Sequence, residues 1–131
     1  QLSINRALAP IDHYRLGRAL APLRERGILI VASGNLIHNL HEYAWGGAGV
    51  EPYDWAQRFE TQAKAAMLAG KHQSLIEYQA LGRDALLSAP TPEHYLPLLY
   101  VLGAQSPDDA VSFPVEGIDG GSISMLSVRV G

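Results

Sequence analysis

The chain has 131 residues, of which 47% are apolar and 18% charged, enough for one domain with its own core. Its net charge of −3, without any basic run, argues against a nucleic-acid partner, and no apolar run approaches the roughly 20 residues of a membrane span. There are no cysteines, so disulfides, thiolate nucleophiles and cysteine-bound metals are excluded. We expect a cytoplasmic protein and leave self-association into a homo-oligomer open.

The first 34 residues predict a βαβ unit. Residues 1–4 alternate polar and apolar side chains as a strand does, and residues 10–26 have helical leucine spacing that Pro22 interrupts and Gly27 ends. Residues 28–32 form an apolar run between turn residues, which is typical of a strand buried on both faces. Such a unit implies a parallel strand pair. The predicted fold class is therefore α/β, with a mixed, largely parallel sheet flanked by helices.

Two helices follow in the middle of the chain. Pro52 starts a helix over residues 53–69, and a shorter one follows over residues 72–78. The longer helix carries one apolar stripe at helical spacing, which predicts plain core packing. Its members are Trp55, Ala56, Phe59, Ala63, Ala66 and Met67.

The last third predicts a buried helix and a strand pair. Residues 81–90 indicate a loop or a broken helix. Thr91 suits the N-cap and Pro92 the first position of a helix that runs to residue 104 and is apolar nearly all round. Residues 110–115 and 122–130 predict an antiparallel pair that closes the chain at the sheet edge.

Two histidines stand out among the five as candidates for chemistry. His38 follows the apolar run 28–32, in a polar turn with Asn35 and Asn39, and His94 opens the buried helix. The crevice beyond the carboxyl ends of the strands is where an α/β sheet binds ligands. Two histidines meeting there suit a non-haem Fe(II) or a zinc site, which needs one further carboxylate or imidazole. A structural role for each histidine remains the alternative.

The other candidate chemistries have little support. The remaining histidines have polar neighbours on helical or loop segments, where a structural or surface role is the usual one; they are His13, His41 and His72. The G-x-S-x-G nucleophile elbow and the G-x-G-x-x-G phosphate loop are both absent. Nothing in the sequence pairs two carboxylates as glycoside hydrolysis would require.

Three stretches resemble the class III extradiol ring-cleavage dioxygenases, specifically the single-subunit DOPA 4,5-dioxygenase type. They are ILIVASGNLIHNL (residues 28–40), TPEHYLPLLYVLGA (residues 91–104) and FPVEGIDGGSISMLSVRVG (residues 113–131). The resemblance covers residues 1–131 in order and corresponds to the C-terminal portion of one such catalytic domain. The family's N-terminal HGSP-like and SAHW-like turns, whose histidines are metal ligands, do not occur in this sequence.

The resemblance implies a non-haem Fe(II) enzyme that opens a catechol, such as a DOPA-like one, with O₂. It implies His94 as a metal ligand and His38 either as a ligand or as the acid/base that deprotonates the catechol. Asn35 and Asn39 are candidates to orient His38 or to bind a substrate oxygen, and Tyr95 is a candidate to line the substrate pocket. Zinc could occupy the same site, so a non-catalytic zinc-binding or interaction protein on the same scaffold is the alternative. The missing N-terminal half is the implied partner, and the 131 residues alone are expected to be inactive.

Overall fold

The computed structural model describes residues 1–46 and 49–131. It is a mixed α/β arrangement in which helices and short antiparallel strand pairs surround one core. The helical elements are α1 (Pro10–Leu20), η1 (Ala21–Arg26), α2 (Asp54–Leu68), α3 (His72–Ile76), η2 (Tyr78–Leu81), α4 (Arg83–Ser88) and α5 (Leu96–Gly103). The strands are β1 (Val111–Ser112), β2 (Ile118–Asp119), β3 (Ile123–Ser124) and β4 (Arg129–Val130).

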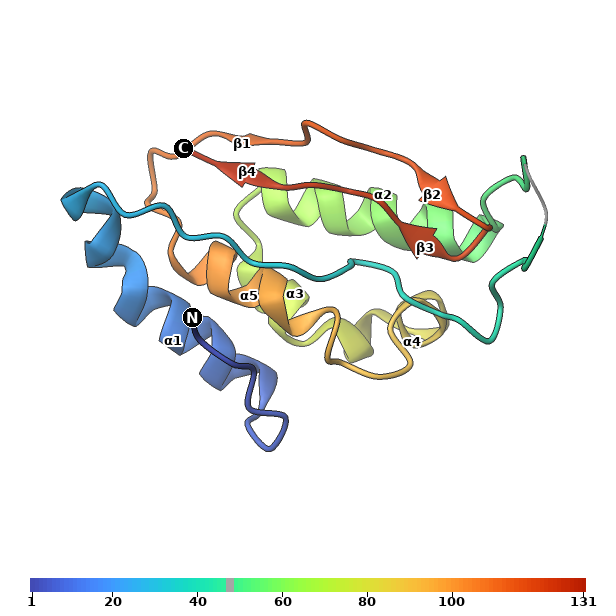
Figure 1. Ribbon diagram of the computed structural model, residues 1–131, viewed down its shortest axis with the longest axis horizontal. Helices are drawn as coiled ribbons and strands as arrows, with labels where there is room; N and C mark the ends of the chain where they lie inside the picture. Colours follow the sequence, from blue (N-terminus) through green and yellow to red (C-terminus); the bar gives the residue numbers. More distant parts are fainter. Residues whose placement is uncertain (47–48) are drawn as a thin grey trace.

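The C-terminal strands form one long hairpin along the top of the molecule in Figure 1. β1 pairs with β4 and β2 pairs with β3, and both pairs are antiparallel. The predicted antiparallel pairing of residues 110–115 with residues 122–130 is confirmed by β1 and β4, whereas β2 lies in the stretch between the two predicted strands. The predicted parallel pair is not found among the described residues, because neither residues 1–4 nor residues 28–32 belong to a strand.

The segment 28–37 is the main departure from the predicted fold. Figure 1 shows it crossing in front of α5 and then running beside the hairpin without regular secondary structure. It was expected to be buried on both faces, but Leu29 is 84% and Val31 79% exposed. The prediction of a doubly buried strand is therefore wrong for this chain, since nothing in the described part covers these side chains.

Proline and glycine residues set the boundaries of the first helical segment. α1 gives way to η1 at Ala21, directly before Pro22, and Gly27 ends the segment with a left-handed backbone (φ 72°), as predicted. α2 follows the predicted range, and its apolar stripe lies in the core, apart from the half-buried Trp55. Residues 83–88, expected to be a loop or a broken helix, form α4.

α5 begins four residues later than predicted. The helix begins at Leu96 instead of Pro92, and a bend at residues 91–92 and a turn at residues 93–95 precede it. Pro97 explains the shift, because a proline without an N–H fits the first helical turn but not a position further inside. The helix is buried as predicted, with Leu99 and Leu102 fully enclosed.

α1 is bound to the rest of the molecule by two histidine–tyrosine pairs. His13 Nδ1 shares a 3.0 Å hydrogen bond with the Tyr100 hydroxyl, and His72 Nδ1 shares one of 3.0 Å with the Tyr14 hydroxyl. The rings also meet edge to face in both pairs. These contacts place His13 and His72 in helix packing. Within the described residues, no helix is long and apolar enough to cross a membrane.

The His72 pair predicts an acid-sensitive fold. Burial lowers the pKa of His72 from its ordinary 6.5, because it disfavours the charged ring. The unfolded chain therefore binds the proton more readily, and the free energy of unfolding should fall as the pH drops from about 7 toward the lowered folded pKa.

Urea unfolding at about pH 7.5 and about pH 5.5 measures this effect. The His72→Phe variant should show a smaller pH dependence than the unchanged chain, since it cannot take up the proton. A residual slope is expected from His38, whose pKa is also lowered. If the free energy of unfolding of the variant depends on pH as strongly as that of the unchanged chain, His72 does not contribute to the acid sensitivity.

Candidate metal and acid/base site

The two candidate histidines lie against each other. The His38 and His94 rings stack with a centroid separation of 3.7 Å and an interplanar angle of 10°. His38 is half-buried and His94 exposed. The pKa of His38 is lowered, mainly by burial and then by the charge of His94. Residues 56 positions apart in the sequence thus form one imidazole pair.

His38 is fixed through its backbone. Its N–H donates to the Ser88 carbonyl at 2.8 Å, and it forms an antiparallel bridge with Ile123 of β3. On either side, the Ser124 N–H donates to the Ile37 carbonyl and the Asn39 N–H donates to the Ser122 carbonyl. The end of the 28–38 segment is therefore held in register on the hairpin, even though the rest of the segment is not.

The backbone of His94 is held by close contact with Gly34 and Asn35. Its carbonyl accepts a hydrogen bond from the Asn35 N–H at 2.8 Å. A Cβ on Gly34 would lie 2.2 Å from the same carbonyl oxygen, so only glycine allows this contact. Residues 34 and 35 thus set the distance between the segment that carries His38 and the turn that carries His94.

Asn35 and Asn39 make structural hydrogen bonds. The Asn35 side-chain amide donates to the Ser124 carbonyl at 2.8 Å, and the buried Asn39 amide donates to the Leu87 carbonyl at 2.7 Å. The Asn39 Oδ1 also accepts the N–H groups of His41 and Glu42. Both side chains position the turn around His38. Their contact with a substrate stays a prediction.

Replacing Asn39 with Ala should destabilise the fold by about 1–3 kcal/mol, because the Leu87 carbonyl and two N–H groups lose their partner. Chemical denaturation measures this loss. Asn5→Ala is a matched control, since that exposed amide only bonds Ala7 nearby, and should change stability by less than about 0.5 kcal/mol. Equal effects for the two variants would contradict the role given to Asn39.

Tyr95 is placed in the core. Its side chain is fully buried, its hydroxyl donates to the Leu75 carbonyl at 2.7 Å, and its ring lies 4.3 Å from that of Tyr78. Burial strongly raises its pKa, so the hydroxyl remains protonated. The structure gives Tyr95 a packing role beside the site, and a substrate contact for it stays a prediction.

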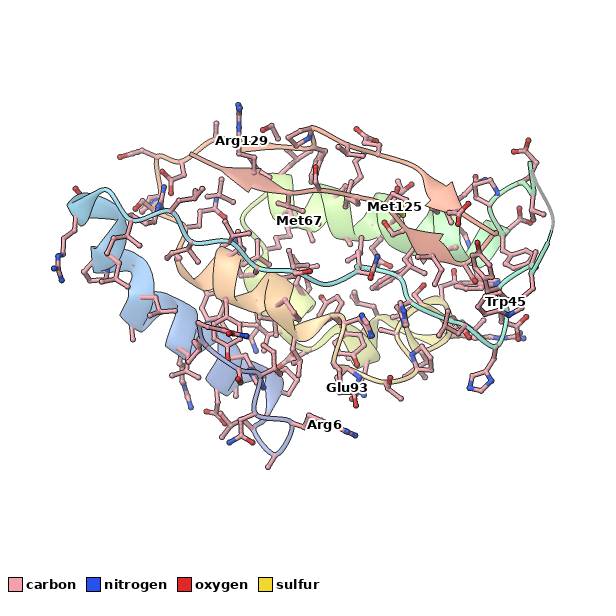
Figure 2. The ribbon with its side chains drawn as sticks, in the orientation of Figure 1. Arg6, Trp45, Met67, Glu93, Met125 and Arg129 are labelled. Carbon is pink, nitrogen blue, oxygen red and sulfur yellow. The ribbon has the colours of Figure 1, made fainter. Side chains whose placement is uncertain are left out.

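Two polar interactions near the site were not predictable from the local sequence. Figure 2 shows Arg6 and Glu93 at the lower edge of the molecule, where they form a 2.9 Å ion pair next to His94. The Glu93 pKa is lowered, first by a hydrogen bond from its own N–H. The buried Glu60 carboxylate accepts a hydrogen bond from the Ser124 hydroxyl. Only the folded chain brings these partners together, so motif spacing could not reveal them.

The site offers two imidazoles as metal donors. Within residues 1–46 and 49–131, no group of three or more His, Asp or Glu side chains is placed to hold a metal ion. Imidazole suits both iron and zinc, so the donor chemistry fits such an ion. The number of donors falls short of a full metal shell, which needs at least one more protein ligand.

Comparison with known proteins gives the family. Residues 1–128 match the family model described as the catalytic LigB subunit of aromatic ring-opening dioxygenase. The chain is 46% identical over 134 residues to a 4,5-DOPA dioxygenase extradiol of Escherichia coli (strain K12), covering 100% of this chain and 49% of that protein. It is 33% identical over 129 residues to one of Beta vulgaris, covering 98% and 47%.

A solved structure has the same fold. The crystal structure of an uncharacterized protein from Escherichia coli K12 matches with a TM-score of 0.90 and 45% identity, covering 98% of this chain and 53% of that one. The chain thus spans about half the length of the relatives it matches. It belongs to the LigB family of aromatic ring-opening dioxygenases, of the class III extradiol type.

Proposed function

We propose that this chain forms part of a non-haem Fe(II)-dependent extradiol dioxygenase that opens DOPA-like catechols. The stacked pair of His38 and His94 carries the proposal, because it unites the two predicted site residues at one edge of the fold. The names of the relatives support the same reaction class. In this reaction both oxygen atoms of O₂ enter the product, and the ring bond next to the two hydroxyls breaks.

The ring geometry favours different roles for the two histidines. An imidazole would hold a metal ion through the lone pair of a ring nitrogen. The two rings are nearly parallel with centroids 3.7 Å apart, so their nitrogen lone pairs lie in separate planes and do not converge on one point. We assign His94 as the metal ligand and His38 as the acid/base beside it.

The chain's own residues then act as follows. His38, held by Ser88 and by the hairpin, accepts the proton of a catechol hydroxyl at a ring nitrogen. Asn35 keeps the turn of His94 in place through its N–H. The Fe(II) ion, when bound, lowers the pKa of a coordinated hydroxyl and brings the catechol and O₂ together.

The remaining donors come from outside the described residues in this proposal. Two imidazoles do not complete a metal shell, and the relatives are about twice as long as this chain. We propose that the part of the family domain beyond these 131 residues supplies the other ligands. The 131 residues alone should then show no turnover.

A chimera tests the proposal, in which this chain replaces the matching part of the E. coli relative. Loaded with Fe(II), the chimera should consume O₂ in the presence of DOPA, and His94→Ala should lose its bound iron. A chimera that keeps its metal but consumes no O₂ with any of a panel of catechols would support the non-catalytic metal protein instead. Unaltered iron content in His94→Ala would remove the ligand assignment.

A further inference from the structure

Ser124 of β3 connects separate parts of the fold through its four polar groups. Its N–H donates to the Ile37 carbonyl at 3.0 Å, and its carbonyl accepts the Asn35 side-chain amide at 2.8 Å. Its hydroxyl accepts the Leu126 N–H at 3.1 Å and donates to the Glu60 carboxylate of α2. The serine is 1% exposed, so little water competes for these bonds. It therefore links α2, the hairpin and the segment that leads to the site.

The placement of Ser124 bears on both site histidines. Asn35, whose amide is held by the Ser124 carbonyl, donates its own N–H to the His94 carbonyl at 2.8 Å. On the other side, Ile123 precedes Ser124 in β3 and forms the antiparallel bridge with His38. The ring centroids of the two histidines are 3.7 Å apart, and a shift of β3 would move one ring relative to the other.

Glu60 stands at the far end of this series of hydrogen bonds. It lies on α2 and is 9% exposed. Across the residues that the structure describes, no ion pair includes Glu60. Burying a carboxylate without a cation costs free energy, and an apolar side chain would pack at the same place without that cost. Core packing therefore does not account for an acidic residue here, whereas a need for a strong hydrogen-bond acceptor does.

The carboxylate fixes the orientation of the Ser124 hydroxyl. A carboxylate accepts hydrogen bonds and does not donate them, so the Ser124 O–H points to Glu60 and its lone pairs are left for the Leu126 N–H. The helix that carries Glu60 is firmly packed, since Phe59 and Ala63 on either side of it are fully buried. Glu60 thus joins β3 to a rigid part of the core.

We propose that Glu60 is a positioning residue for the imidazole pair, acting through Ser124 and Asn35. It contacts neither substrate nor metal in this role. Its hydrogen bond holds β3 where Asn35 and the bridge to His38 set the two rings. The effect on turnover rests on the proposed function of His38 and His94, whereas the effect on ring geometry does not.

Variants of Glu60 in the Fe(II)-loaded chimera test this role. Glu60→Ala should lower kcat for DOPA by about 10–100-fold and change KM by less than about threefold, because misplaced groups slow the chemical step more than they weaken binding. Glu60→Gln keeps an oxygen that can accept the Ser124 hydroxyl, so it should recover most of the rate. Ser124→Ala loses the same hydrogen bond but keeps its backbone contacts. It should match Glu60→Ala, and it replaces that variant if Glu60→Ala fails to fold.

Ala63→Gly is the matched control for a purely structural loss. It weakens α2 one turn away, because glycine is a poor helix former, and it removes no hydrogen bond of Ser124. It should lower the melting temperature but leave kcat unchanged when every variant is assayed well below its melting temperature.

Crystal structures of the metal-free chimera give a readout that needs no turnover. The centroids of the His38 and His94 rings should stay 3.7 Å apart in the unchanged chimera and in Ala63→Gly. In Glu60→Ala they should shift by more than about 0.5 Å, the tolerance within which a catalytic site must be held.

Three results would overturn the positioning role. The first is a loss of kcat in Glu60→Ala no larger than in Ala63→Gly, and the second is an unmoved ring pair in Glu60→Ala. The third is a Glu60→Gln variant as slow as Glu60→Ala, which would make the charge important and not the hydrogen bond. If the unchanged chimera consumes no O₂, the proposed function fails, and the ring geometry alone decides the role of Glu60.

Discussion

His38→Gln in the iron-loaded chimera is expected to lower kcat for DOPA by about 10²–10⁴-fold while the iron content stays unchanged. This range is the usual contribution of a positioned acid/base. The amide keeps polarity and approximate size but cannot accept a proton at neutral pH. Because the His38 backbone is held by Ser88 and Ile123, the turn itself should survive the change.

The iron content decides between the two roles of His38 that the sequence left open. If His38→Gln loses iron as His94→Ala does, His38 is a ligand and the acid/base assignment is wrong. His41→Gln is the matched control, because His41 is exposed, lies three residues away and belongs to the same turn. It should retain both the iron and the full rate.

Gly103→Ala is expected to destabilise the chain by about 1–3 kcal/mol, the usual cost of overpacking. A Cβ at this position would lie 2.2 Å from the Tyr14 carbonyl oxygen of α1. Gly17 makes the reciprocal approach, since its Cβ would lie 2.4 Å from the Tyr100 carbonyl oxygen of α5. The two helices therefore touch backbone to backbone, and a single methyl group forces them apart.

A double-mutant cycle checks this crossing by chemical denaturation. Gly17→Ala should lower the free energy of unfolding by a similar amount. The double variant should lower it by less than the sum of the two single losses, because the first methyl group already separates the helices. Ala19→Ser, on the exposed face of α1, should change stability by less than about 0.5 kcal/mol. Full additivity, or a loss below about 1 kcal/mol for Gly103→Ala, would contradict the close crossing.

Local signals in the sequence predicted the first helical segment and α2 well. Pro22 and Gly27 set the break and the end of the first helical segment, because proline lacks an N–H and glycine accepts a positive φ. The apolar stripe of α2 predicted its buried face. These features depend on neighbouring residues, so spacing alone was sufficient.

Features that depend on distant partners were not predictable from spacing. The run at residues 28–32 has the composition of a buried strand, yet burial depends on what lies beside it, and the described residues leave it exposed. At the end of the chain, alternation did predict the hairpin, because its two strands are close in sequence and pair with each other.

The sequence predicted the two histidines of the site but not the hydrogen-bond partners of the asparagines beside them. The junctions of apolar and polar residues singled out His38 and His94, which the fold stacks together. Nothing in the sequence spacing revealed that the side-chain amides of Asn35 and Asn39 donate hydrogen bonds to the carbonyls of Ser124 and Leu87. Those partners come from remote turns, so only the folded chain shows that the asparagines position the site.

Anomalous X-ray diffraction at the iron edge, from crystals of the Fe(II)-loaded chimera, locates the metal ion. The proposed ligand role of His94 predicts one iron peak about 2.0–2.1 Å from a ring nitrogen of His94, the usual distance for zinc bound to imidazole, with His38 adjacent but not bound to it. An iron peak away from His94, or no ordered iron near the imidazole pair, would contradict it.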